Sequence, residues 1–362
     1  DGTYVFEDYL DNDGIELEER IAIRGAVTVR GSDFLVDFSG TSPQVRGPLN
    51  SVPSSTLSAV YYVVRAITDP AIPNNAGCYR PISVTLPTGS ILNPEPPAAV
   101  NSRTATVKRC VDVLMGALVR AAPERFPAAS TGQLLVLSLG GIDPRTGRAY
   151  VTSELGGGGL GARPCKDGID VVDTDVNNCM NIPVEALEMD YPIRILKNNL
   201  WADSCGAGRY RGGLGYEKVF QALRGQVVVS HRGERFYTAP WGLCGGRPGR
   251  KSRSLVRRRS GATEEIPSKR VFTLDEGETL HVFTAGGGGW GDPLERPPEE
   301  VRSDVLDRKV SQTTAREEYG VIIDAEDQSV NVAATEELRR ELRQRRGPIT
   351  WLFDRGEPLG RS

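Results

Sequence analysis

The sequence is poor in the residues that build metal and redox centres. It has two histidines, and its six cysteines include neither a C-x-x-C pair nor a cysteine–histidine cluster. These absences exclude a zinc knuckle and a thioredoxin-type motif. We therefore expect reduced thiols, which are typical of the cytoplasm.

Long hydrophobic runs and a strong charge of one sign are also missing. No stretch approaches the ~18 consecutive apolar residues that cross a bilayer, and no apolar core follows a charged start as in a signal peptide. With 44 basic and 47 acidic residues, the formal net charge of −3 provides no field that would gather nucleic acid or anionic lipid. We expect neither nucleic acid nor a membrane as a partner. The most basic stretch, residues 247–259, is predicted to be the solvated face of a hairpin.

The hydrophobic patterning predicts an α+β fold that is rich in antiparallel sheet. Apolar residues alternate over residues 21–38 around a polar turn, which predicts a half-buried β-hairpin. Short β-type runs separated by glycine-rich turns fill residues 134–285. Apolar residues at three- and four-residue spacing predict two buried helices, over residues 57–67 and 104–122.

Three regions follow from this pattern. Residues 1–100 hold the β-hairpin and the first helix, and residues 101–293 form a glycine-rich, β-dominated core region that contains the second helix. The proline-rich stretch 81–97 must be extended and separates these two regions, because proline removes a hydrogen-bond donor and restricts the preceding residue. Residues 294–362 are predicted to be a helical C-terminal tail, since charges dominate there.

The glycine runs do not form a nucleotide site. The sequence contains no G-x-x-x-x-G-K-[ST] motif, so ATP cannot be bound by a P-loop. Glycine spacings like those of a dinucleotide site lack the strand, the helix and the later acidic residue that such a site needs. The run at residues 286–289 is predicted instead to let backbones cross closely at a domain junction.

The segment DTDVNNCMNIPVEALE, residues 173–188, is too polar to be only a turn. Asp173 and Asp175 would point to the same face of a strand, where two carboxylates can hold a hard divalent cation or share a proton. The alternative is a pair of solvated acids that lead into a turn. We therefore predict Asp173 and Asp175 as candidate metal ligands and Asp175 as a candidate catalytic group.

Three asparagines and a proline complete this segment. The amides of Asn177, Asn178 and Asn181 are able to hold a planar imide or a carboxylate by paired hydrogen bonds, although capping and turn formation would explain one of them. Pro183 is predicted at the first position of a short helix. The Cys179 thiol would need a histidine brought near it in space to act as a nucleophile.

A second polar cluster, residues 230–235, ends a predicted strand. His231 is the better catalytic candidate of the two histidines, with Glu234 beside it and Arg232 as a group that binds an anion. A surface ion-pair network is the competing interpretation. Arg103, at the start of the second helix, adds a positive rim that would face the same cleft.

Five motifs make the sequence resemble one family along most of its length. They are VDFSGTSPQVRGPLN at residues 36–50, AGCYRP at 76–81, PAAS at 127–130, GAGRYRGGLG at 206–215 and TAGGGGWGDP at 284–293. Together with the polar segment, they are similar to the C-terminal portion of hydantoinase B, the B-type subunit of ATP-dependent hydantoinases and 5-oxoprolinases. Subunits of acetone and acetophenone carboxylases are related to that family.

The resemblance implies a B-type component of an ATP-dependent cyclic amide hydrolase. An A-type partner would use ATP to phosphorylate the amide, and the B-type component would complete ring opening, so a hetero-oligomer is implied. A divalent metal ion is also implied. Its histidine- and aspartate-rich motif would lie before Asp1, in an N-terminal B-type region or a separate chain.

Two other functions remain open at this stage. The chain would serve a ketone carboxylase of the acetone or acetophenone type, or it would be a non-catalytic assembly subunit of such a complex. All three depend on one spatial hypothesis, that the polar segment before Pro183 and the cluster near His231 meet in a common pocket.

Overall fold

The first layer of the molecule is a four-stranded sheet that forms as the alternating pattern predicts. The computed structural model describes residues 1–69 and 71–357, and the sheet has the order β1 (Gly2–Leu10), β2 (Ile21–Arg30), β3 (Asp33–Asp37) and β4 (Ile82–Thr85). Strands β2 and β3 are antiparallel and turn at Gly31, whose φ of 56° suits glycine. The predicted hairpin is confirmed. Strand β4 pairs in parallel with β3 after a crossover through α1 (Pro53–Ile67).

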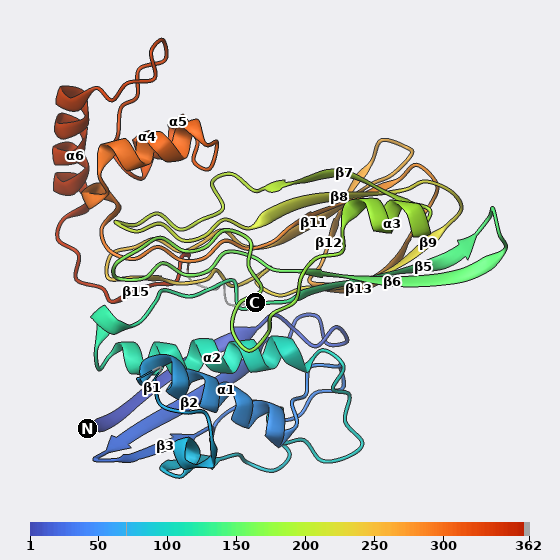
Figure 1. The fold of residues 1–362 in the computed structure, drawn as a ribbon, viewed down its shortest axis with the longest axis horizontal. Helices are drawn as coiled ribbons and strands as arrows, with labels where there is room; N and C mark the ends of the chain where they lie inside the picture. The colour runs from blue at the N-terminus through green and yellow to red at the C-terminus, as the bar shows by residue number, and fades with distance from the viewer. Residues whose placement is uncertain (70, 358–362) are drawn as a thin grey trace.

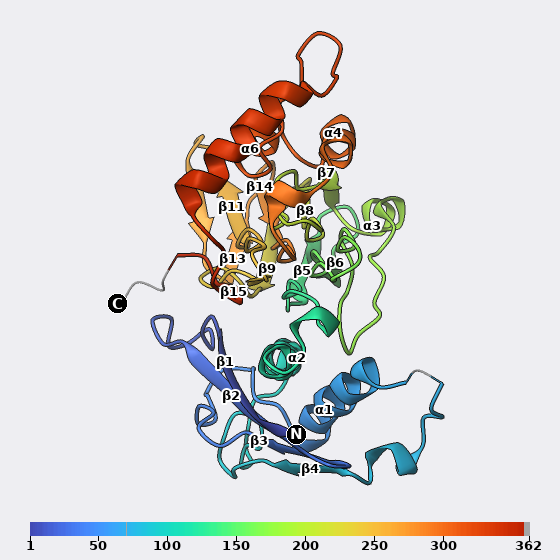
Figure 2. The ribbon, with the colours of Figure 1, turned by 90° about the vertical axis from the view of Figure 1, so that its left-hand side faces the viewer.

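Helix α2 (Arg103–Val119) lies between this sheet and the rest of the molecule (Figure 1). Fourteen of its seventeen residues are buried. One side of α2 packs against β1, β2 and α1, and the strands that follow it in the chain lie on its other side (Figure 2). The predicted helix is confirmed, and three of its charged residues, Lys108, Arg109 and Asp112, are buried. Helix α2 shares its apolar core with the first sheet.

Two antiparallel sheets face each other above α2 and form a sandwich. One has the order β13–β9–β5–β6, with β5 (Leu135–Asp143), β6 (Arg148–Gly156), β9 (Val227–Arg232) and β13 (Lys269–Leu274). The other has the order β12–β11–β14–β8–β7, with β7 (Ile193–Leu200), β8 (Tyr216–Ala222), β11 (Arg253–Arg257), β12 (Thr263–Ile266) and β14 (Thr279–Phe283). Inward-facing residues of both sheets form one core, which confirms the predicted β-rich region.

Glycine-rich segments join the sandwich to the first layer. Gly213 N donates to the Leu160 carbonyl at 2.8 Å, Gly287 N donates to the Gly213 carbonyl at 2.9 Å, and Gly288 N donates to the Ala129 carbonyl at 2.8 Å. A Cβ atom on Gly159 would overlap the backbone of Gly213 and Gly287. The prediction that these runs let backbones cross closely is confirmed.

The C-terminal region is helical, as predicted, and it docks on the body. Its helices are α4 (Pro298–Leu306), α5 (Gln312–Glu317) and α6 (Val332–Arg346), and β15 (Phe353–Asp354) then pairs with β10 (Gly242–Leu243). Arg339 anchors α6 by donating to the carbonyls of Tyr319 and Arg296. The last five residues of the predicted tail lie outside the described residues. Within residues 1–69 and 71–357, no helix combines the length and the apolar character that crossing a membrane requires.

Candidate functional site

The polar segment 173–181 is an irregular wall between two cavities. It is not a strand, and Asp175 has a left-handed backbone with φ of 60°, so the expectation that Asp173 and Asp175 share one strand face is wrong. Asp173 lines one cavity and Asp175 lines the other. We call them the Asn181 cavity and the Asp175 cavity.

A buried lysine of α2 fixes the wall in place. Lys108 Nζ donates to Asp173 Oδ1 at 3.0 Å and also to the Thr174 carbonyl. The other carboxylate oxygen, Asp173 Oδ2, accepts the backbone N–H of Cys179 at 3.0 Å. Separating Lys108 from Asp173 would leave a buried charge without a partner, which is costly. The ion pair therefore keeps the wall in a fixed position relative to α2.

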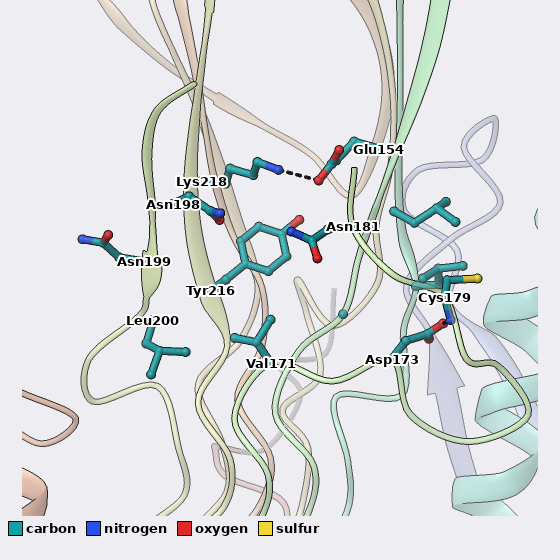
Figure 3. Close-up of a pocket in the computed structure, with 13 residues that line it drawn as sticks. Glu154, Val171, Asp173, Cys179, Asn181, Asn198, Asn199, Leu200, Tyr216 and Lys218 are labelled. Carbon is teal, nitrogen blue, oxygen red and sulfur yellow. Dashed lines mark hydrogen bonds and ion pairs between the residues drawn. The ribbon is translucent and has the colours of Figure 1, made fainter. Parts of the chain in front are cut away.

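The Asn181 cavity lies between edge strands of the two sheets, β6 on one side and β7 with β8 on the other (Figure 3). Its volume is about 290 Å³. Three polar groups form its floor, three asparagine amides lie around it, and the other side chains are mostly apolar. The lining residues are Leu134, Glu154, Leu155, Gly157, Val171, Asp173, Cys179, Asn181, Asn198, Asn199, Leu200, Tyr216 and Lys218.

The floor of this cavity has unused hydrogen-bonding capacity. Lys218 Nζ donates to Glu154 Oε1, whereas Glu154 Oε2 and the Tyr216 hydroxyl have no partner among the described residues, although both side chains are at least 93% buried. Burial, reinforced by the charge of Glu154, raises the pKa of Tyr216, so its hydroxyl keeps its proton. Buried polar atoms without partners are costly. Here a fixed acceptor and a fixed donor line one small cavity.

The Asp175 cavity is larger, about 470 Å³, and it lies beside α1 and α2. Burial raises the pKa of Asp112 to about 7, with a further contribution from Asp175. Burial also raises the pKa of Asp175, and burial together with the charge of Asp175 raises the pKa of Tyr62 to about 12. The two carboxyls therefore hold protons more tightly than exposed acids do.

Behind Asp112, a network of buried ion pairs joins the two layers. Arg235 Nη2 donates to Asp112 Oδ2 at 2.7 Å, and Arg109 Nη1 donates to Asp8 Oδ2 at 2.8 Å. Although burial opposes it, the charges of Arg109 and Arg235 hold the pKa of Asp8 at about 2. Because Arg235 follows β9 and Asp112 lies on α2, this network locks the sandwich onto the first layer.

Comparison with known proteins identifies the family. A family model described as hydantoinase B/oxoprolinase matches residues 1–293. The chain belongs to the hydantoinase B/oxoprolinase family. It is 34% identical to the putative B-type subunit of a D-/L-hydantoinase from Pseudomonas sp. (strain NS671), over 94% of this chain and 59% of that protein.

A solved structure agrees with this assignment to the hydantoinase B family, and a second one shares the fold. The crystal structure of ATP-dependent caprolactamase from Pseudomonas jessenii superimposes with a TM-score of 0.82 and 30% identity, covering 94% of this chain and 60% of that one. A nucleotide-free acetone carboxylase shares the fold, with a TM-score of 0.81 and 21% identity, over 95% of this chain and 53% of that one. The chain spans 57 to 59% of the length of the first curated relatives that it matches.

The predicted acidic pair does not fit a metal ion in this hydantoinase B chain. Both oxygens of Asp173 are engaged by Lys108 and a backbone N–H, and Asp175 lies in the other cavity. Across the described parts of the chain, no group of three or more histidine, cysteine, aspartate or glutamate side chains is placed to hold a metal. A metal with its ligands elsewhere in the assembly stays a prediction.

His231 and Glu234 are structural in this fold, which argues against their predicted catalytic role. His231 is 1% exposed, and its ring nitrogens contact the Ser268 carbonyl at 3.0 Å and Ser254 Oγ at 2.9 Å. Glu234 is 2% exposed and accepts from Lys269 Nζ at 2.5 Å and from Asp11 N at 2.9 Å. With these partners, neither side chain is free to exchange a proton with a substrate.

We expect His231 to shape the acid stability of the protein. Burial lowers its pKa from 6.5 to about 4, so the unfolded chain binds a proton that the native state does not. The stability that neutral His231 contributes is present above pH 6.5 and is lost as the pH falls toward 4. His231→Gln should therefore flatten this acid loss, by up to about 3 kcal/mol, in urea unfolding measured across that pH window. Identical pH dependence of the two proteins would contradict the argument.

The remaining predicted binding residues are dispersed. Asn181 lines the cavity that carries its name, while Asn177 and Asn178 belong to the same wall but not to the cavity lining. Arg232 Nη1 donates to Ser102 Oγ at 3.3 Å, and Arg103 is exposed at the start of α2. The two predicted clusters are connected through Asp112, which lines the same cavity as Asp175 and accepts a hydrogen bond from Arg235. They do not meet through His231.

Proposed function

We propose that the chain is part of the B-type component of an ATP-dependent cyclic amide hydrolase. The observation that carries this proposal is the Asn181 cavity in a member of the hydantoinase B family. A carboxylate oxygen and a hydroxyl with no partner among the described residues lie there between apolar side chains. A cyclic amide such as a lactam has methylene groups on one side of its ring and the amide nitrogen and oxygen on the other. The apolar side chains of the cavity suit the methylenes, and its polar groups suit the amide.

In this proposal, Glu154 acts as the general base. Its Oε2 takes a proton from water as the water oxygen attacks the carbon of the amide, which an A-type partner has activated by phosphorylation. Lys218 holds the carboxylate in place through Oε1. The Tyr216 hydroxyl donates a hydrogen bond to the ring nitrogen, and Glu154 returns the proton to this nitrogen as its bond to carbon breaks. The acyl phosphate that remains is hydrolysed by a second water to the carboxylate and inorganic phosphate.

The apolar and amide side chains position the ring. Leu134, Leu155 and Val171 contact the methylenes, and their burial by the ligand contributes the hydrophobic part of the affinity. Asn181, Asn198 and Asn199 have no side-chain hydrogen bond within residues 1–69 and 71–357, and they donate to the activated oxygen. The A-type partner, which uses ATP, completes the hetero-oligomer. A divalent metal would have its ligands outside this chain, and no step here is assigned to it.

The test is turnover by the complete B-type component together with an A-type partner. We expect ATP-dependent opening of a cyclic amide, measured with caprolactam, 5-oxoproline and hydantoin as candidate substrates, and at least about tenfold loss of turnover in Asn181→Ala. Unchanged turnover in Asn181→Ala and Glu154→Gln alike would favour a non-catalytic assembly role.

A ketone carboxylase is the second candidate, because the chain shares its fold with an acetone carboxylase. The same assay separates the two functions when acetone or acetophenone is supplied with and without bicarbonate. A product that forms only with bicarbonate would support the carboxylase and contradict amide hydrolysis.

A further inference from the structure

The Asn181 cavity has a buried floor and an exposed mouth. Glu154, Tyr216 and Lys218 form the floor and are buried. The lining residues 179, 181 and 198–200 are exposed, and they come from two segments on opposite sides of Tyr216 (Figure 3). We call residues 179–181 and 198–200 the mouth. The cavity therefore opens to the surface between the polar segment and strand β7.

No charged side chain belongs to the mouth. Its residues are Cys179, Met180, Asn181, Asn198, Asn199 and Leu200, and Met180 is 89% exposed. The next charged residue along β7 is Lys197, which points to the opposite face of the sheet from Asn198 and pairs with Glu217 at 2.5 Å. The mouth is therefore an uncharged surface around an opening.

Exposed apolar side chains continue from the mouth along β7 and α3 (Val184–Asp190). Leu196, 52% exposed, lies at a β-bulge of β7. Glu188 Oε1 accepts the backbone N–H of Ile195 at 2.7 Å, which holds α3 beside this bulge. The next residue of α3, Met189, is 78% exposed. Exposed apolar side chains that gather beside an opening are typical of a surface that contacts another protein.

Charged side chains lie at the border of this apolar surface, and the acidic ones outnumber the basic ones. Glu185 and Asp190 are exposed on α3, and Arg194 is exposed on β7. None of these three side chains forms an ion pair within residues 1–69 and 71–357. A partner that carries basic side chains around an apolar centre would therefore complement both the border and the mouth.

We propose that the mouth, together with Leu196 and Met189, is the surface on which an A-type partner docks, through a contact with an apolar centre and a basic rim. This rests on the proposed function, in which the partner phosphorylates the amide whose ring then lies in the Asn181 cavity. The activated amide has to pass from the partner into the cavity, and the mouth is where the lining is exposed. A partner that covers the mouth also keeps bulk water away from the activated amide.

The charges at the border favour this partner over a second copy of the chain. A symmetric contact between two copies uses the same surface on both. It would bring the acidic border of one α3 toward that of the other, and like charges across an interface are unfavourable.

The first test measures association of the complete B-type component with an A-type partner by calorimetry. Leu196→Lys and Met189→Lys place a charge in the apolar centre, and each should weaken binding at least about tenfold, equivalent to about 1.4 kcal/mol. Asp190→Lys should also weaken binding, because the basic rim of the partner would meet a like charge. Val332→Lys, at a 63% exposed position of α6 far from α3, is the matched control and should bind as the unaltered protein does (Figure 1).

The second test uses two exposed thiols to report whether the partner covers the mouth. Cys179 belongs to the mouth, whereas Cys165 lines the Asp175 cavity. A saturating concentration of the A-type partner should slow alkylation of Cys179 by iodoacetamide at least about tenfold, because thiol reactivity follows exposure. Cys165 should react at an unchanged rate. Mass spectrometry of the alkylated peptides follows both thiols in one sample.

Absence of association, undiminished affinity in both Leu196→Lys and Met189→Lys, or equal alkylation of Cys179 with and without the partner would overturn the inference. A B-type component that is oligomeric by itself and dissociates in Leu196→Lys would assign the surface to a second copy and would also overturn it. Turnover by the complex with unimpaired association of the lysine variants would reject this surface alone. Association that the lysine variants weaken, in a complex that opens no cyclic amide, would reject the proposed function alone.

Discussion

Replacing Glu154 with glutamine should reduce ring opening by at least about 100-fold, the usual loss when a positioned general base is removed. Glutamine keeps the shape of the side chain and can still accept from Lys218, but it cannot take up the proton of the attacking water. The measurement is kcat for cyclic amide hydrolysis in the assembled enzyme, beside the unfolding free energy of the chain. We expect binding of the cyclic amide to change much less than kcat.

Glu234→Gln is the matched control for this variant. Glu234 and Lys269 form a second buried glutamate–lysine pair, with the side chains 2% and 5% exposed, yet neither residue lines the Asn181 cavity. Both substitutions remove one charge from a buried pair, so both should cost stability to a similar extent. If Glu234→Gln lowers kcat as strongly as Glu154→Gln at equal stability, the assignment of Glu154 as the base is wrong.

The sequence predicts the secondary structure of this protein better than the positions of its charges. Alternation in β2 and β3 and the three- and four-residue spacing in α2 are local patterns, and both are confirmed. The burial of Lys108 and Asp112 was harder to predict, because a charged side chain on a helix is normally solvated. The pattern that indicates it is their position within an otherwise apolar helix, where each charge needs a buried partner.

The floor of the Asn181 cavity shows why the rest was out of reach. Glu154 and Lys218 lie on strands of different sheets, 64 residues apart, and each points inward like the buried residues two positions before and after it on its strand. Their pairing depends on how the two sheets stack, which no local pattern encodes. The catalytic role predicted for His231 failed for the same reason. The sequence of a strand end rich in ionisable groups does not show whether those groups face solvent or the interior.

Both cavities depend on the glycine-rich layer beneath the sandwich, and Gly159→Ala should prevent folding. A Cβ atom at this position would overlap the Gly213 carbonyl oxygen and the Gly287 nitrogen, which are backbone atoms and cannot rotate away. Relief requires separating hydrogen-bonded segments, such as Thr131 N from the Gly159 carbonyl at 2.8 Å. We expect a loss of more than about 4 kcal/mol, beyond the range of ordinary substitutions.

The control for this prediction is Gly140→Ala in β5, where the nearest atom to an added Cβ is 3.2 Å away and the next are side-chain atoms. It should change stability by no more than about 1 kcal/mol, because the neighbours need to move only slightly. Urea unfolding and soluble yield compare the two variants. If Gly159→Ala were as stable as Gly140→Ala, the backbone segments around Gly159 would have to lie further apart than these contacts imply. The wall at residues 173–181 would be affected too, because it joins this layer where Val172 N donates to the Gly158 carbonyl at 2.8 Å.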